Sequence, residues 1–596
     1  MRHLVLLFAA AFLVLFLNLG GPRLWDRDEP RNAGCAAEML QRADWVTPMF
    51  NGELRDHKPV LLYWFMMVSY VLFGVNEFAA RLPSALLAVG TVWMVYLMGR
   101  RMFSASAGLW SGIILTSTLM FGVAGRAATP DSVLIFFTTL ATTLFVLATF
   151  PCGEDEQEKP DEYPQSWWTI AAIYLVMGIA MLGKGPVGLV LPTAVLGMYL
   201  LIRWLPKIEP ASTRWQATLG LLRPFAPRHF LQTCWRMRPI TAILISLAIA
   251  LPWYIWVGIR TDGAWPSGFF LQHNVGRAMQ SMEGHGGSIA YYPLAILVGF
   301  FPWSVFLVPL LIMLVRQFRG DDSWNRGATL AICWVAVYLV LFSIASTKLP
   351  SYITPCYPGA ALLFGCFADR WMRGHPTISY SWMTVALSVT GVVGVAMLVG
   401  VPIAAAQFLP GGTIIAAIGL VPLTTAAVAL WYHLQRRPEL TVKCFAAGSV
   451  ALTATAFGLV SLELDSHQKQ HELLRVIGQR STDATVGSYA CLEPSWVFYL
   501  RQPVIELQAK SSGAAKLTRE HDWQPRPRPG LEEFLSRGPG HFVITTERAR
   551  AGFSNLPLGV VELADVPYFL KSERLVLLGW IDKRSYVAAN PGSRVR

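Results

Sequence analysis

Long apolar runs that contain no charged residue recur along most of the chain. Each run is roughly 17 to 25 residues long, which is the length that a helix needs to cross a bilayer. Short segments between the runs hold most of the charge. The pattern predicts a polytopic α-helical membrane protein with about thirteen spanning helices, at 3–20, 80–98, 106–123, 132–150, 167–183, 186–202, 240–258, 291–315, 327–346, 352–369, 378–400, 412–432 and 441–462.

One apolar run, at 60–74, is shorter than a membrane-spanning helix requires and is flanked by His57-Lys58-Pro59 and Glu77. We expect it to lie along the outer interface as a juxtamembrane helix. With that assumption every basic cluster falls on the inner side, as the positive-inside rule requires, beginning with Arg100-Arg101. The segment 151–165 is acidic, and acidic residues weigh little in this rule. The orientation predicts a bacterial inner-membrane protein whose C-terminal segment lies in the periplasm.

Composition agrees with the pattern, since 54% of the 596 residues are hydrophobic and 14% are charged. A soluble chain has about a quarter of its residues charged. The net charge of +12 sits mainly in the short inner segments, which excludes a nucleic-acid-binding face. The apolar run after Arg2-His3 is followed by no small-x-small cleavage site before Trp25, which favours an uncleaved first helix over a secretory signal.

No cysteine pair shows CxxC or metal-ligand spacing. Cys35 and Cys491 are the cysteines that fall in outer segments, which leaves a disulfide between them open.

After Leu462 the composition becomes mixed and polar, which predicts two domains, 1–462 in the membrane and 463–596 outside. Apolar segments at 495–500, 541–545 and 574–578 predict strands of a small α/β domain. The segment 524–530, QPRPRPG, predicts a loop.

The residues able to do chemistry gather at the outer ends of the predicted helices. A charge at membrane depth is costly and therefore marks a functional candidate. The set comprises Asp28, Glu29, Arg31, Asp56, His57, Lys58, Arg126, Asp131, Lys184, His273, Arg277, Lys348 and Tyr352.

This mixture of cations and carboxylates suits an anionic lipid headgroup beside a hydroxyl that must lose its proton. Lysine and arginine can hold a phosphate leaving group, and a carboxylate can accept the proton. Structural alternatives stay open: Asp28 and Glu29 as acids at a helix N-terminus, Lys58 as an interfacial anchor, and Arg126 with Asp131 as a salt bridge. A divalent cation also stays open, although no metal-ligand spacing is seen, and no phosphate-binding GxxxxGK[ST] loop is present.

Several outer segments resemble the bacterial aminoarabinose transferases, which are relatives of the protein O-mannosyltransferases among the type C glycosyltransferases. The matching segments are Asp28-Glu-Pro-Arg-Asn-Ala-Gly-Cys-Ala-Ala-Glu-Met39, Asp44-Trp-Val-Thr-Pro-Met-Phe-Asn-Gly52, Lys58-Pro-Val-Leu-Leu-Tyr-Trp64, Ala80-Arg-Leu-Pro-Ser-Ala85 and Ser346-Thr-Lys-Leu-Pro-Ser-Tyr352. They cover residues 1 to about 370, and the plan of membrane helices followed by an outer domain covers the rest.

The resemblance implies roles for individual residues. It implies Asp28, beside Glu29 and Arg31, as the acid that engages the acceptor, with Asp131 as a second acidic position. It implies Lys58, Arg277 and Tyr352 as the residues that hold or gate a polyprenyl phosphate, with Lys184 facing the same cavity. Apart from the resemblance, Arg31, His57 and His273 are predicted substrate contacts because they belong to the same group of outer residues. Two positions depart from the family: Asn32 stands where a phosphate-contacting tyrosine is usual, and His57 where many members have glutamate.

We therefore expect an integral-membrane glycosyltransferase that moves a sugar from a polyprenyl-phosphate donor to a lipid, glycan or protein acceptor, with inversion at the anomeric carbon. The rival interpretation is a transporter or lipid flippase, which would place charges through the membrane midplane and show two matched halves. The sequence leaves the sugar, the acceptor and the need for a metal open.

Overall fold

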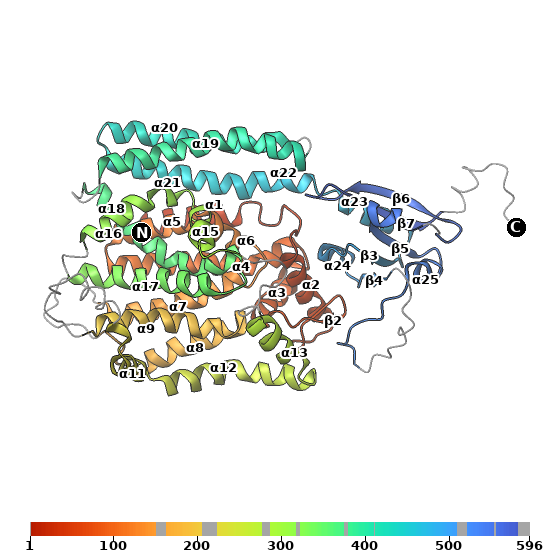
Figure 1. Cartoon of the computed structure of the whole chain (residues 1–596), viewed down its shortest axis with the longest axis horizontal. Coiled ribbons are helices and arrows are strands. Elements are labelled where there is room, and N and C mark those ends of the chain that lie inside the picture. Colours follow the sequence, from red (N-terminus) through yellow and green to blue (C-terminus); the bar gives the residue numbers. More distant parts are fainter. Residues whose placement is uncertain are drawn as a thin grey trace. The chain divides into compact units, whose positions relative to one another are not determined.

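The computed structural model describes residues 2–150, 162–205, 223–276, 287–317, 322–374, 379–409, 412–508, 521–553 and 556–581. The chain divides into two compact units (Figure 1). We call the first the helical unit; it comprises Met1–Gly20, Asp56–Leu398 and Ala417–Leu459. We call the second the mixed unit; it comprises Gly21–Arg55, Val399–Ala416 and Val460–Arg596.

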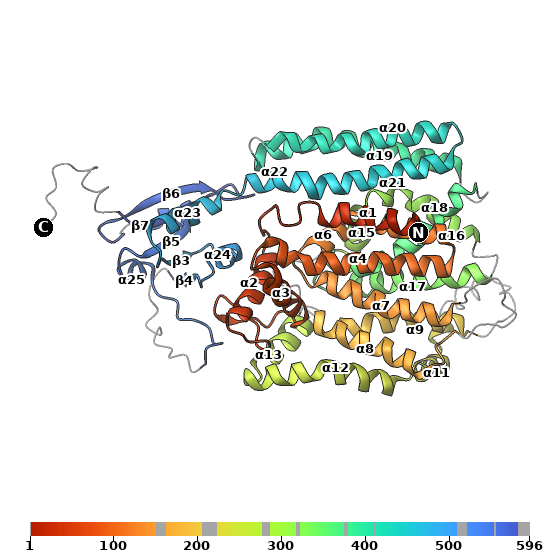
Figure 2. The same ribbon diagram turned by 180° about the vertical axis from the view of Figure 1, so that it is seen from behind.

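The described part of the helical unit is built from helices alone, which run along one another in a bundle (Figure 2). Their bounds are α1 Arg2–Phe16, α3 Leu61–Phe73, α4 Glu77–Met102, α5 Ala105–Thr116, α6 Leu119–Arg126, α7 Asp131–Thr149, α8 Trp167–Lys184, α9 Val187–Arg203, η1 Arg223–Phe225, α11 Pro227–Arg236, α12 Pro239–Arg260, α13 Ala264–Ser267, η2 Gly268–Gly276, α15 Tyr291–Gly299, η3 Trp303–Phe306, α16 Leu307–Gln317, α17 Asp322–Ile344, η4 Pro350–Cys356, α18 Tyr357–Met372, α19 Tyr380–Phe408, η5 Gly412–Gly419, α20 Leu420–Leu434, α21 Pro438–Thr455 and η6 Ala456–Val460. The last residues of α19 and η6 and the first residues of η5 belong to the mixed unit.

Within the described residues, eight helices are long and apolar enough to cross a membrane. They are Glu77–Met102, Asp131–Thr149, Trp167–Lys184, Pro239–Arg260, Arg326–Ile344, Tyr380–Gln407, Gly412–Leu434 and Pro438–Ser466. The number rises to ten if each of two sharply bent helix pairs counts as one span. The chain is thus a multi-span helical membrane protein, while the predicted total of thirteen is not confirmed.

The two bent pairs correct the expectation of continuous spans at 106–123 and 291–315. α5 and α6 meet at 69°, and α15 and the helix that follows it meet at 116°. The two breaks face each other, because the backbone N–H of Leu119 donates to Phe301 O at 3.2 Å and the indole of Trp303 donates to Ser117 Oγ at 2.9 Å. Each break therefore supplies partners for backbone or side-chain groups that lipid could not satisfy.

The helix α3, which corresponds to the apolar run at 60–74, has 13 residues. At 1.5 Å per residue it is about 20 Å long, which is shorter than the ~30 Å hydrocarbon core. Its length fits the predicted juxtamembrane helix, and its placement at the outer interface stays a prediction.

The mixed unit contains a five-stranded sheet in the order β4-β3-β5-β7-β6. β3 pairs in parallel with β4 and β5, whereas β7 pairs antiparallel with β5 and β6. Leu575 and Leu577 of β7 lie in one apolar cluster and Val576 and Leu578 in another, so both faces of the sheet are covered. The elements are α2 Asp28–Gln41, β1 Met49–Phe50, β2 Glu53–Leu54, α22 Ser461–Ser466, α23 Gln470–Arg480, β3 Thr485–Tyr489, α24 Pro494–Leu500, β4 Ile505–Leu507, α25 Leu531–Leu535, β5 His541–Thr546, α26 Glu547–Ala551, β6 Val560–Pro567 and β7 Arg574–Trp580.

The α/β character of this unit is confirmed, as are strands at 541–545 and 574–578 and the loop at 524–530. The predicted strand at 495–500 is wrong, because this segment forms α24. Pro494 opens that helix at a position where its missing N–H costs nothing. Cys35 and Cys491 are both buried and both free thiols, so the disulfide left open by the sequence is not formed.

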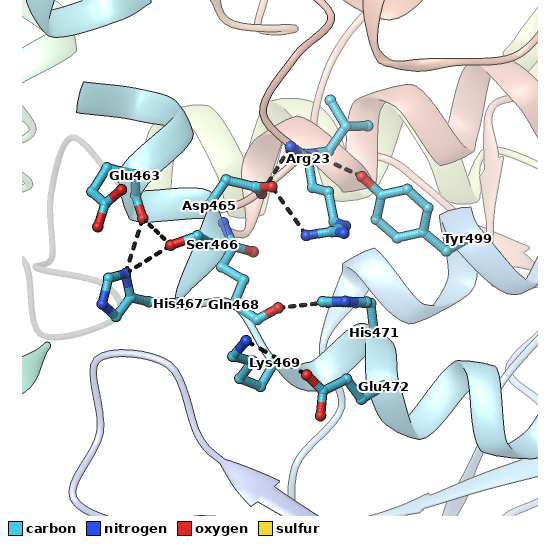
Figure 3. Close-up of polar contacts among 11 residues, drawn as sticks. Arg23, Glu463, Asp465, Ser466, His467, Gln468, Lys469, His471, Glu472 and Tyr499 are labelled. Atoms are coloured by element: carbon cyan, nitrogen blue, oxygen red, sulfur yellow. Dashed lines mark hydrogen bonds and ion pairs between the residues drawn. The ribbon is translucent and has the colours of Figure 1, made fainter. Parts of the chain in front are cut away.

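The segment 21–55, which follows the first predicted span, packs within the mixed unit. α2 lies against α24, and the amide of Asn51 exchanges two hydrogen bonds with the backbone of Val504, at 2.9 and 2.7 Å. Arg23 donates from its backbone and from its guanidinium to Asp465 at 2.9 and 3.0 Å, and the neighbouring Leu24 N–H donates to the hydroxyl of Tyr499 (Figure 3). No pattern in the sequence indicated this grouping, and the predicted boundary at 462/463 stays a prediction.

Candidate active site

A carboxylate and two histidines form a compact cluster in the helical unit. Asp56 Oδ1 lies 3.0 Å from His57 Nδ1 and 3.3 Å from His273 Nε2. The two imidazole rings lie with their centroids 4.0 Å apart. Asp56 and His57 come from the segment before α3, whereas His273 comes from the π-helical turn η2.

The backbone of η2 approaches this cluster closely at Gly268. A Cβ atom placed on Gly268 would lie 1.7 Å from Oδ2 of Asp56, so no side chain fits there without a shift. Glycine at this position thus allows the turn that carries His273 to pack against the Asp56 carboxylate.

The pKa of Asp56 is lowered from its ordinary value. Burial alone would raise it, but hydrogen bonds from His273 and His57, together with the charge of the two imidazoles, outweigh burial. Asp56 is therefore ionised at neutral pH and supplies a fixed negative charge beside both rings.

Asp56, His57 and His273 also have the donor set of a divalent cation site. One ligand atom from each lies within 4.8 Å of the others, and carboxylate oxygen with imidazole nitrogen suits zinc and related ions. Within the described residues, the Nδ1 atom of His273 is buried and has no hydrogen-bond partner. These residues fit a bound cation, which would add positive charge beside the cavity described below.

A second charged group joins α7, α8 and η4. Lys184, at the end of α8, forms an ion pair with Asp131, the first residue of α7. The ammonium of Lys184 also lies 5.3 Å from the ring centroid of Tyr352 in η4. The side chains of Lys184 and Asp131 are 12% and 13% exposed, so water screens this pair only weakly.

His57 and His273 of the first group and Lys184 and Tyr352 of the second line one cavity of about 190 Å³ in the helical unit. Its walls contain two lysines, two histidines and several aromatic rings, and they include His57, Lys58, Lys184, Phe269, His273 and Tyr352. Five of the residues singled out from the sequence, namely His57, Lys58, Lys184, His273 and Tyr352, thus meet at one cavity. Asp131 is connected to the cavity by its ion pair with Lys184, which lines it.

Two further candidates from the sequence have structural partners instead. Lys348 is 4% exposed and donates to the carbonyls of Ser343 and Ala345 at 2.8 and 3.1 Å, which caps the end of α17. Arg126 donates to the carbonyls of Val14 and Leu17 at 2.9 and 2.8 Å, whereas Asp131 forms its ion pair with Lys184.

The remaining site residues fall elsewhere. Asp28, Glu29 and Arg31 belong to α2 of the mixed unit, with both acids in the first turn of the helix, where the helix dipole favours negative charge. Asn32, the departure from the family pattern, accepts a hydrogen bond from Arg55 at 3.0 Å within the same unit. Arg277 lies outside the described residues.

The sequence marked Asp56 as one of the outer charged candidates without a role, and it did not single out Phe269. Asp56 directly precedes His57-Lys58, yet its partner His273 is remote in sequence, so no spacing rule could pair them. Phe269 is one of many aromatic residues, and only the fold places it on the cavity wall.

Residues 57–229 match the family model described as dolichyl-phosphate-mannose-protein mannosyltransferase. The chain is 29% identical over 365 residues to an undecaprenyl phosphate-alpha-4-amino-4-deoxy-L-arabinose arabinosyl transferase of Yersinia pestis. That match covers 60% of this chain and 57% of the length of the Yersinia protein. A protein of Aquifex aeolicus is 27% identical over 369 residues, which cover 62% of this chain and 74% of that protein.

Among solved structures, the fold is similar to that of ArnT from Cupriavidus metallidurans bound to undecaprenyl phosphate. The TM-score is 0.72 at 23% sequence identity, and the match covers 97% of this chain and 98% of the other. The similarity extends over both units of the chain and confirms the predicted fold class.

Proposed function

We propose that the chain, which belongs to the aminoarabinose transferase and protein O-mannosyltransferase-like family, is an integral-membrane glycosyltransferase that uses a polyprenyl-phosphate-linked sugar. The observation that carries the proposal is the cavity where Lys58 and Lys184 meet Tyr352 and the His57–His273 pair. Two cations in a cavity within a bundle of apolar helices suit the phosphate of a lipid donor. The relatives named above are transferases, which argues against the transporter or flippase alternative.

The phosphate is the leaving group of the proposed reaction. The bond between the anomeric carbon and the phosphate oxygen breaks, and its electron pair leaves with the polyprenyl phosphate. Lys58 neutralises that developing charge, and Lys184 does so as far as its pairing with Asp131 allows. Tyr352 and His273 orient the headgroup from the cavity wall.

The acceptor hydroxyl attacks the opposite face of the anomeric carbon, which inverts its configuration. Its proton passes to a carboxylate, a role that we assign to Asp28 from the family resemblance, with Glu29 and Asp131 as further acids. Arg277 is a proposed donor contact on the same basis, and Arg31 is proposed as one because it belongs to the group of outer charged residues. The sugar and the class of acceptor, whether lipid, glycan or protein, stay open.

The proposed location is the bacterial inner membrane, with the mixed unit in the periplasm. The basic segments that the sequence places inside support this orientation. A lipid-linked donor suits this compartment, because the sugar is activated by its phosphate and needs no nucleotide at the site.

The test uses the full chain in detergent with a panel of radiolabelled polyprenyl-phosphate sugars. Transfer is read as a mass shift of lipid, glycan and protein acceptors. We expect Lys58→Ala to lower kcat/KM about a hundredfold or more, because the leaving phosphate loses a cation, and Asp28→Asn to abolish transfer.

Lys443→Ala is the matched control, because Lys443 is 53% exposed on α21 and forms its ion pair with the neighbouring Glu439, away from the cavity residues. It should leave transfer unchanged. Movement of the donor lipid across the membrane without formation of a glycosidic bond would contradict the proposal and favour a flippase.

A further inference from the structure

A second cavity, of about 510 Å³, lies in the helical unit between α8, α9, α11 and α12. Its lining on α9 extends from Leu189 to Leu201, which corresponds to a length of about 18 Å along the helix axis. We call it the α9 groove. It shares no lining residue with the candidate active site.

The walls of the α9 groove are suited to hydrocarbon. Two of its polar side chains are already engaged with the protein, since the Tyr174 hydroxyl donates to Met237 O at 2.5 Å and the Thr193 hydroxyl donates to Met177 Sδ at 3.6 Å. A cavity lined mainly by apolar side chains holds water poorly and accepts an apolar guest.

The groove opens to the outside of the bundle. Val190, Phe230 and Ile243 line it and are 54%, 41% and 53% exposed. Because α8 and α12 are membrane spans, an opening between apolar rims at this depth meets lipid rather than water. A lipid chain can therefore enter from the side.

One end of the groove is covered by α11, a short amphipathic helix with the sequence PRHFLQTCWR. Leu231 and Trp235 are 66% and 68% exposed, while Arg228 and Arg236 are exposed on the same helix. Large apolar side chains alternating with arginines are typical of a helix that lies in the membrane interface.

The sequence of α11 and its flanks carries positive charge only. Residues 223–239 contain Arg223, Arg228, Arg236, Arg238 and His229, and no aspartate or glutamate. Basic clusters on an interfacial helix attract anionic lipid headgroups, at a gain of about 1 kcal/mol for each residue near the surface.

Side-chain contacts hold α11 at the end of the groove. His229 Nε2 lies 2.9 Å from Leu201 O, and the Arg236 guanidinium lies 5.2 Å from the ring centroid of Trp204. Both contacts join α11 to the C-terminal end of α9, at Leu201 and at Trp204 directly after the helix, so the basic helix adjoins the apolar groove.

We propose that the α9 groove and α11 form a binding site for one anionic phospholipid of the adjacent leaflet. One acyl chain lies in the groove, and the headgroup phosphate rests on Arg228, Arg236 or Arg238. If the groove held the hydrocarbon chain of a donor whose phosphate is bound at the candidate active site, the arginines of α11 would have no anion to bind. A phospholipid supplies both an acyl chain for the groove and a phosphate for the arginines. The site is independent of the transfer reaction.

The experiment titrates the purified full chain in detergent with phosphatidylglycerol, phosphatidylcholine or undecaprenyl phosphate, and counts bound lipid by native mass spectrometry. We expect phosphatidylglycerol to bind at least tenfold more tightly than phosphatidylcholine. The double variant Arg228→Gln/Arg236→Gln should weaken phosphatidylglycerol binding by about fivefold for each arginine removed. Arg437→Gln, at an exposed arginine between α20 and α21, is the control and should bind normally.

Two variants test the groove itself. Ala194→Phe fills it from α9, and Ile243→Trp covers its mouth from the exposed rim of α12; either should remove phosphatidylglycerol while the thermal unfolding midpoint shows that the fold is intact. Equal affinity for the two phospholipids, binding unaffected by both groove variants, or displacement of phosphatidylglycerol by undecaprenyl phosphate would overturn the proposal.

Discussion

Glu38 of α2 is a half-buried carboxylate that accepts a hydrogen bond from the backbone of Gly52 at 3.1 Å. Burial raises its pKa above the ordinary value, and this effect outweighs the Gly52 hydrogen bond and the charges of Arg42 and Arg526. Because the folded state then holds the proton more tightly than the unfolded state, the contribution of Glu38 to stability is complete below its unfolded pKa and is lost as the pH rises through the folded pKa.

Replacement Glu38→Gln keeps an acceptor for the Gly52 N–H and removes the buried charge. We expect the unfolding midpoint of the variant at pH 7 to equal or exceed that of the parent chain, and the difference to vanish at pH 4. Thermal unfolding of the full chain at both pH values measures it. Glu439→Gln, at a side chain that is 64% exposed, should show no such pH dependence; a loss of stability in Glu38→Gln at pH 7 alone would show that the charge is favourable.

At the scale of elements, η2 depends on Gly268 for its approach to Asp56. The Cβ atom of Gly268→Ala would collide with the carboxylate, so η2 or the Asp56 segment must move and the His57–His273 stack must loosen. We expect a loss of about 1–3 kcal/mol in stability, which is the usual cost of overpacking, together with reduced transfer. Thermal unfolding and the transfer assay measure the two effects.

Gly400→Ala is the matched change, because no atom lies within 4 Å of a Cβ placed there in α19. It should leave both readouts close to those of the parent chain. If Gly268→Ala behaved like Gly400→Ala, the close packing of η2 on Asp56 would not matter for the site.

Elements that depend on local pattern could be predicted from the sequence, and those that depend on remote partners could not. The apolar runs indicated most helices, and five of the proposed site residues lie at one cavity. The break between α5 and α6 could not be predicted, because the residues that supply its hydrogen-bond partners, Phe301 and Trp303, are remote in the sequence. The Asp56–His273 contact could not be predicted either, because the two residues are far apart in the sequence. α24 was mistaken for a strand because its aromatic residues also favour strands.

For the whole molecule, the distribution of basic residues predicts which side of the membrane each loop faces. Single cysteines replacing Arg27 and Ile289 should react with a membrane-impermeant maleimide in spheroplasts, whereas cysteines replacing Arg100 and Arg437 should react after permeabilisation only. All four positions are exposed, so accessibility to the compartment decides the result. If the cysteines at positions 27 and 289 were labelled from different sides of the membrane, α2 and the outer loops of the helical unit would lie in different compartments. They could then not share an active site.

The membership of residues 21–55 in the mixed unit has a consequence for biosynthesis. Asn51 and Arg23 find their partners in Val504 and Asp465, which lie 453 and 442 residues further along the chain. At about 5–20 residues per second the ribosome needs roughly 20–90 s to deliver them. An early loop must therefore wait, exposed and incompletely folded, until the end of translation, and a chimera that exchanges the C-terminal segment between relatives has to carry this loop with it.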